Sequence, residues 1–265
     1  MNQAQLQAII IFDIDGVIRD VSNSYRKAIA DTVEEFTKGG WRPTMEDLDN
    51  LKSEGIWNND WEASQELTYR YFEAMDKPRE EVNLDYDTIV KYFQERYRGK
   101  HPELFDGYIA DEPLLVTPQY FQQLQANGVE YGFFSGATRG SAEFILKHRF
   151  KLDNPVLVAM EDAPSKPNPS GMFQAIAQIA STDNIPAFYL GDTVADMYTV
   201  VKAREQKPER KWIAVGILPP HVQTTKAGRE DYAQKLLAAG AEIVLSNIQK
   251  LNLDLIEELL KDVKG

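Results

Sequence analysis

The chain has 265 residues, no cysteine and a formal net charge of -12. Its length predicts one large or two modest domains, because a domain usually holds roughly 100 to 200 residues. The lack of cysteine excludes disulfides, thiolate metal sites and cysteine nucleophiles. The acidic balance, without a cluster of basic and aromatic residues, argues against a nucleic-acid partner.

The apolar stretches are all too short for a membrane span, which needs roughly 20 residues. The first residues also lack the basic and then apolar pattern of a signal peptide. We therefore expect a cytoplasmic protein with no membrane partner. The oligomeric state is left open.

An apolar run at 8–12 is typical of a buried strand, and two carboxylates, Asp13 and Asp15, follow it directly. On extended backbone, side chains two residues apart point the same way, so both carboxylates would reach the loop at the carboxyl end of the strand. Gly16 then allows a sharp turn and a close approach by a ligand. The alternatives are an ordinary strand-to-loop turn that happens to be acidic and a calcium loop of the EF-hand type. Against the calcium loop, Val17 is no ligand and no helix precedes the stretch.

Later in the chain, short apolar runs alternate with helical patterns, as in repeated β-α units with a parallel sheet. The expected strands are 131–134, 156–158, 188–190, 212–215 and 242–245, in addition to 8–12. The fold class is therefore α/β. Two connections, 205–211 and 216–228, look longer than a minimal core needs, and their role is left open.

Between about 19 and 107 the chain contains no convincing strand and instead predicts four helices, at 22–36, 44–54, 61–75 and 85–98. Thr44 stands three residues before Asp47, close to a capping box, and Asp60 is the expected cap of the third helix. We therefore expect a core domain of residues 1–18 and 108–265 and an inserted helical domain of residues 19–107.

Further polar residues lie at the ends of later strands. Ser135 and Gly136 follow the second expected strand, and Lys166 lies in the loop before the helix near 170–180. Asp192 follows the strand at 188–190, and Asp196 comes one helical turn later. Taken singly, Ser135 and Asp192 could cap helices and Lys166 could be a surface lysine. Together, carboxylates that hold a divalent cation and groups that bind an anion predict a phosphoryl-transfer site.

These residues resemble the four motifs of the haloacid dehalogenase superfamily. The motifs are Asp13-Ile14-Asp15-Gly16-Val17, Ser135-Gly136, Lys166-Pro167, and Gly191-Asp192 with Asp196. A helical insertion between the first two motifs further resembles the subgroup that contains phosphoglycolate phosphatase and β-phosphoglucomutase. The resemblance implies a Rossmann-like parallel-sheet core with a helical cap.

The resemblance also implies a role for each residue. Asp13 would be the nucleophile and Asp15 the general acid and base. Magnesium would be held by Asp13, the backbone carbonyl of Asp15, and Asp192. Phosphate would be bound by Asp13, Gly16, Ser135, Gly136 and Lys166, and Asp196 would orient Lys166 or a metal-bound water.

Asp15 separates branches of the superfamily, because dehalogenases carry an aromatic residue and phosphonoacetaldehyde hydrolases a small one at that position. An acid there favours an oxygen leaving group. The resemblance therefore implies a magnesium-dependent phosphatase of a small phosphomonoester metabolite. A phosphomutase of the same superfamily and a non-catalytic phosphometabolite-binding protein are the alternatives.

Substrate choice is expected to depend on the loop 55–61 between the second and third helices. Its candidate residues are Trp57, Asn58, Asn59 and Trp61. Large aromatic and short polar side chains suit a loop that closes over a small polar ligand. The alternative is that the two tryptophans anchor the loop and Asp60 caps the next helix.

Overall fold

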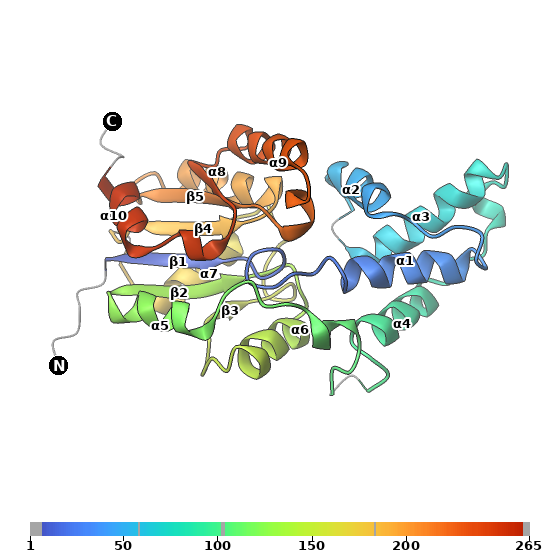
Figure 1. The fold of residues 1–265 in the computed structure, drawn as a ribbon, viewed down its shortest axis with the longest axis horizontal. Helices are drawn as coiled ribbons and strands as arrows, with labels where there is room; N and C mark the ends of the chain where they lie inside the picture. The colour runs from blue at the N-terminus through green and yellow to red at the C-terminus, as the bar shows by residue number, and fades with distance from the viewer. Residues whose placement is uncertain (1–6, 58, 102–103, 183, 262–265) are drawn as a thin grey trace. The chain divides into compact units, whose positions relative to one another are not determined.

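The structure is a computed structural model that describes residues 7–57, 59–101, 104–182 and 184–261. Two compact units divide the chain: Met1–Asp20 with Pro113–Gly265, and Val21–Glu112. The first unit holds all of the strands and the second holds helices α1 to α4 (Figure 1). No helix among the described residues is both long and apolar enough to cross a membrane.

The first unit is built on a parallel sheet of six strands in the order β3-β2-β1-β4-β5-β6. The strands are β1 Ala8–Phe12, β2 Val129–Phe134, β3 Leu157–Val158, β4 Ala187–Gly191, β5 Trp212–Ile217 and β6 Ile243–Leu245. The expected α/β class is confirmed, and so is each expected strand, although 156–158 shortens to two residues.

The helices of this unit follow the strands. They are α5 Pro118–Ala126, α6 Arg139–Glu143 with a π-helical continuation over Phe144–Arg149, α7 Ser170–Ile179, α8 Val194–Gln206, α9 Lys226–Ala238 and α10 Leu253–Lys261. Short 3₁₀ turns lie at Pro220–Gln223 and Ile248–Lys250.

Strand β1 is buried on both faces, which explains its unbroken apolar sequence. Ile9 and Ile11 belong to a core cluster that also contains residues of α7 and α8. Phe12 meets the α5 ring Phe121 edge to face, with ring centroids 5.6 Å apart. The central strand is thus held by packing from both sides, and its carboxyl end is a rigid platform for the residues that follow.

The second unit consists of α1 Tyr25–Phe36, α2 Met45–Ser53, α3 Asp60–Ala74 and α4 Tyr86–Tyr97, with 3₁₀ turns at Arg79–Glu81 and Tyr108–Asp111. Helix α1 packs against α3 and α4, which also contact each other. The unit extends from Val21 to Glu112, so the expected boundaries 19–107 need correction. The turn at Tyr108–Asp111 belongs to it because the Tyr108 hydroxyl donates to Asp31 of α1.

Two expected helix starts were also wrong. The first helix begins at Tyr25, after Ser24, and not at Ser22. The third begins after Asn59, whose side chain accepts hydrogen bonds from the backbone N–H groups of Trp61 and Glu62, so the cap is not Asp60. The expected capping box between Thr44 and Asp47 is present.

Candidate active site

The sheet brings three of the expected site residues to neighbouring strand ends. Phe12 pairs with Phe133 of β2 on one side and with Leu190 of β4 on the other. The Asp13 N–H donates to the Leu190 carbonyl at 2.8 Å, which extends this register by one residue. Asp13 therefore leaves the centre of the sheet beside the ends of β2 and β4, which lead to Ser135 and Asp192.

Lys166 joins Asp13 to Asp196. Its ammonium nitrogen lies 3.0 Å from Asp13 Oδ1 and 2.7 Å from Asp196 Oδ1. The Lys166 side chain is 12% exposed and the Asp196 side chain is fully buried. Among the described residues, Asp13 Oδ1 has no hydrogen bond of good geometry, even with the ammonium so near. Lys166 therefore offsets the Asp13 charge mainly through space, whereas it donates a hydrogen bond to Asp196.

Asp196 is held by the start of α8. Its Oδ2 accepts the Thr193 N–H at 2.9 Å and the Thr193 hydroxyl at 2.6 Å, and its own N–H returns a bond to the hydroxyl, which completes a capping box. Its Oδ1 accepts from Lys166 and from the Tyr189 hydroxyl at 3.1 Å. Four donors thus occupy both oxygens, which suits a residue that orients Lys166 better than one that binds a metal.

Three carboxylates lie close together at a candidate cation site, with Asp13 and Asp192 as the expected ligands and Asp196 beside them. Asp13, Asp192 and Asp196 each offer an oxygen within 4.8 Å of the others. Burial, with Asp196 and Asp15 nearby, raises the pKa of Asp13 to about 7 despite the opposing effect of Lys166. Burial and the charges of Asp196 and Asp13 also raise the pKa of Asp192 well above its usual range. Such shifts mean that Lys166 alone does not neutralise the cluster, and a divalent cation would supply the missing positive charge.

Gly16 leaves room beside this cluster. Its φ of +72° is a left-handed conformation, and a Cβ built there would lie 2.1 Å from Asp192 Oδ2. Any other residue would displace the Asp192 carboxylate. The oxygen-only donor set, the Asp13 oxygen without a hydrogen bond and this space all fit a hard divalent ion such as Mg²⁺.

Asp15 does not belong to the group of three carboxylates. Its Oδ1 accepts the Nε–H of Arg19 at 2.7 Å and lies 2.6 Å from Nη2 of the same side chain. Arg19 was not among the residues expected at the site. Its spacing of four residues from Asp15 was the only signal in the sequence, and on irregular backbone this spacing has no fixed geometry.

Ser135 and Gly136 lie where β2 ends. The Ser135 N–H donates to the Val158 carbonyl at 3.0 Å, and its Oγ accepts the Ala137 N–H at 3.1 Å. Ser135 is therefore not the cap of α6, which begins after Thr138. A Cβ at Gly136 would meet no atom within 4 Å, so this part of the loop is open. The loop presents a hydroxyl and backbone N–H groups, a combination that binds phosphate oxygens.

The candidate specificity residues lie in the helical unit. The indole N–H of Trp57 donates to Glu54 at 2.7 Å, and Arg70 binds Glu54 through two nitrogens and lies over the Trp57 ring. Trp61 is half-buried in the first turn of α3. Asn58 lies outside the described residues. The tryptophan contacts favour the anchoring alternative for Trp57, and the Asn59 side chain serves as a helix cap.

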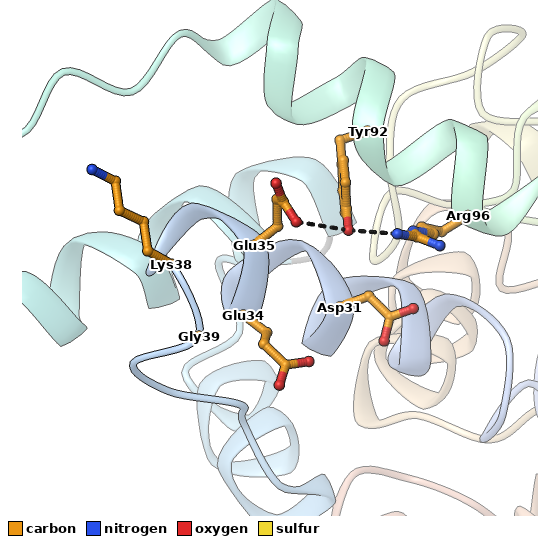
Figure 2. Close-up of a pocket in the computed structure, with 7 residues that line it drawn as sticks. All are labelled: Asp31, Glu34, Glu35, Lys38, Gly39, Tyr92 and Arg96. Atoms are coloured by element: carbon orange, nitrogen blue, oxygen red, sulfur yellow. Dashed lines mark hydrogen bonds between the residues drawn. The ribbon is translucent and has the colours of Figure 1, made fainter.

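The helical unit also contains a surface hollow of about 650 Å³ that is lined by acidic and basic side chains (Figure 2). It is lined by Asp31, Glu34, Glu35, Lys38, Gly39, Tyr92 and Arg96. Arg42 binds both Asp31 and Glu34, and the Tyr92 hydroxyl links Glu35 to Arg96. Its carboxylates are therefore matched by groups of the same unit, and this hollow lacks the arrangement of a reactive centre.

Comparison with known proteins shows the family to which the chain belongs. The family model of haloacid dehalogenase-like hydrolases matches residues 8–203, and the chain belongs to that family. It is a hydrolase of the α/β fold class, with a helical insertion between β1 and β2.

Solved structures of similar fold include the phosphatase Tt82 from Thermococcus thioreducens, with 22% identity, a TM-score of 0.62 and coverage of 84% of this chain and 98% of that one. CbbY from Rhodobacter sphaeroides in complex with phosphate has 15% identity, a TM-score of 0.60 and coverage of 93% and 96%. A β-phosphoglucomutase from Pyrococcus sp. strain ST 04 has 15% identity, a TM-score of 0.59 and coverage of 96% and 99%.

One curated relative is an imidazoleglycerol-phosphate dehydratase from Phytophthora nicotianae, which is 29% identical over 248 residues. The match covers 91% of this chain and 50% of the relative. The chain therefore spans about half the length of that protein.

Proposed function

We propose that the protein is a magnesium-dependent phosphatase that hydrolyses a small phosphomonoester through a phosphorylated Asp13. The observation that carries this proposal is a buried carboxylate beside a buried lysine at the carboxyl end of the central strand, with Asp192 close by. Membership of a hydrolase family supports the same reaction type.

In the first half-reaction, an Asp13 oxygen would attack phosphorus as the bond between phosphorus and the ester oxygen breaks. Asp15 would give its proton to that leaving oxygen. In the second half-reaction, Asp15 would take a proton from water, whose oxygen attacks phosphorus. The bond from phosphorus to Asp13 then breaks, so that inorganic phosphate and the free carboxylate are released.

The neighbouring residues would lower the barrier through charge and position. Lys166 would stabilise negative charge on the transferring group, because its ammonium lies within 3.0 Å of the nucleophile. Asp196 would hold Lys166 in place through its own fixed position on α8. Ser135 and the N–H groups of the Gly136 loop would bind phosphate oxygens.

Asp13, Asp192 and the Asp15 backbone carbonyl would hold the magnesium ion. When bound, the ion offsets the repulsion between a carboxylate nucleophile and an anionic phosphate. The donor set at this site fits such an ion, since only oxygen ligands are present among the residues grouped there.

The experiment that tests this function is release of inorganic phosphate from a panel of phosphorylated metabolites, with and without magnesium. The panel includes sugar phosphates, phosphoglycolate and imidazoleglycerol phosphate, the last because one relative is an imidazoleglycerol-phosphate dehydratase. We expect magnesium-dependent release that chelation abolishes and re-addition restores. Transfer of the phosphoryl group to a second sugar hydroxyl, without net release, would instead assign a mutase. Binding without either reaction would assign a sensor.

A further inference from the structure

Arg19 is the largest fully buried side chain of the described chain. Two of its nitrogens, Nε and Nη2, approach a single carboxylate oxygen, Asp15 Oδ1, at 2.7 and 2.6 Å. The Asp15 side chain itself remains 31% exposed. One end of this ion pair is thus inside the protein, and the other faces solvent.

A buried arginine needs an explanation, because removing a guanidinium from water costs several kcal/mol and the ion pair does not always recover it. An apolar side chain of similar size would fill such a position at lower cost. A charge retained here therefore indicates a task beyond packing, and one group that it contacts is Asp15.

The backbone holds Arg19 independently of this contact. The Gly16 N–H donates to the Arg19 carbonyl at 2.9 Å, and Arg19 pairs with Leu114 of the returning chain in an isolated antiparallel bridge. On either side of this bridge, the Leu115 N–H donates to Ile18 and the Asp20 N–H to Pro113. The backbone of Arg19 is therefore fixed by contacts that do not involve Asp15, and its buried side chain has less freedom to move than the partly exposed Asp15 side chain.

We propose that Arg19 is a positioning residue for Asp15. By occupying Oδ1, it fixes the carboxylate rotamer and leaves Oδ2 to exchange a proton with the leaving oxygen and later with water. This inference rests on the proposed phosphatase function, in which Asp15 is the acid and base. Because its own side chain is fully buried, Arg19 would not touch the substrate and would act on the reaction through Asp15.

The test is a double-mutant cycle read with two substrates, an alkyl phosphate and an activated aryl phosphate. Aryl oxide leaves with little help from an acid, so its hydrolysis depends weakly on Asp15. We expect Arg19→Lys and Arg19→Gln each to lower kcat for the alkyl ester ~10-fold or more, with little change in KM and about twofold or less on the aryl ester. In the Asp15→Asn background, the same changes should have no further effect.

Arg210 provides the matched control, because it is another buried arginine of the same unit. Its guanidinium donates to the carbonyls of Ile185 and Thr182, at 2.6 and 2.8 Å. Arg210→Lys should lower thermal stability and leave the ratio of alkyl to aryl activity unchanged. Comparison of the Arg210 and Arg19 variants separates the general effect of losing a buried arginine from the specific effect of losing the contact with Asp15.

Each outcome decides the matter. Equal losses on both esters, losses that multiply in the double mutant, or variants that unfold would assign Arg19 a structural role and overturn the proposal. If the wild-type protein hydrolyses both esters, the phosphatase function stands whatever the Arg19 variants do. If it releases phosphate from neither ester nor from any metabolite of the panel, the function fails and the role of Arg19 fails with it.

Discussion

Asp13 is buried and lies among several charged groups at the site. The residue is 6% exposed, and its carboxylate lies near the charges of Lys166, Asp196 and Asp15. The ionised form of Asp13 is therefore costly, and the phosphoryl group that it would receive brings further negative charge. Lys166 and the proposed magnesium ion would have to offset both.

Asp13→Asn should abolish phosphate release while the protein stays folded. The amide has nearly the same shape, but it is not nucleophilic, so the loss should reach about four orders of magnitude or more. Single-turnover phosphate release measures this directly, with circular dichroism to confirm the fold. Near wild-type turnover would exclude the phosphorylated Asp13.

Asp15→Asn should harm poor leaving groups more than good ones. An alkyl oxide needs a proton as it leaves, whereas an activated aryl oxide does not. We expect the ratio of alkyl to aryl kcat/KM to fall by ~10-fold or more. Equal losses on both esters would show that Asp15 acts through the metal or the fold.

At the scale of elements, the N-terminal capping box of α8 also positions a residue of the candidate active site. Thr193 and Asp196 close the first turn of α8, and the same Asp196 carboxylate holds Lys166. The capping box thereby fixes the lysine that faces the nucleophile. Because α8 packs on β4 and β5, this arrangement is attached to the core of the sheet.

The start of α3 tests the role of Asn59. Asn59→Ala should lower the free energy of unfolding by about 1 kcal/mol, because the side-chain oxygen that accepts two backbone N–H groups is lost. Asn59→Asp keeps the cap and removes only the amide. Urea unfolding measures the loss of stability in Asn59→Ala. The kcat/KM values on the metabolite panel measure whether loss of the amide changes activity.

If Asn59 is only a cap, the aspartate variant should keep wild-type selectivity. A fall of ~10-fold or more in kcat/KM for the best metabolite in both variants would instead place the amide in contact with the substrate. Ile56, which is 69% exposed, is the control: it lies in the same loop but does not cap the helix. Ile56→Ala should leave stability unchanged.

For the whole molecule, the buried carboxylates make stability depend on pH and on metal. Burial raises the folded-state pKa of Asp13 to about 7, whereas the unfolded value is near 3.8. Between these values the folded protein retains a proton that the unfolded chain has lost, so metal-free stability should fall as pH rises from about 4 to about 7. Asp192 has a raised pKa as well and adds to this slope.

Thermal unfolding in a chelator at about pH 5 and about pH 8 measures the effect. Asp13→Asn should be more stable than the wild-type protein at the higher pH, because the unfavourable charge is gone. Magnesium should raise the Tm of the wild-type protein at that pH and raise that of the variant less, since binding to the folded state stabilises it. A pH-independent Tm without metal would contradict the charge balance derived for the site.

Local sequence determined much of this protein. The apolar run of β1, the carboxylates directly after it and the capping box at Thr44 were all readable, because strand burial and helix caps depend on residues that are neighbours in the chain. Asp13, Ser135 and Asp192 were expected to meet because each follows a parallel strand, and such strands present their carboxyl ends at one edge, whereas Lys166 comes from the loop before α7.

Only the tertiary structure decided the rest. Arg19 meets Asp15 because of a turn whose backbone pairs with Leu114, about 95 residues later. Tyr189 donates to Asp196 because β4 and α8 pack together, and the turn at 108–111 joins the helical unit through a bond to Asp31. Each of these contacts joins groups that are brought together by packing across several elements. Local propensity and spacing carry no information about such contacts, so they appear only when the whole chain has folded.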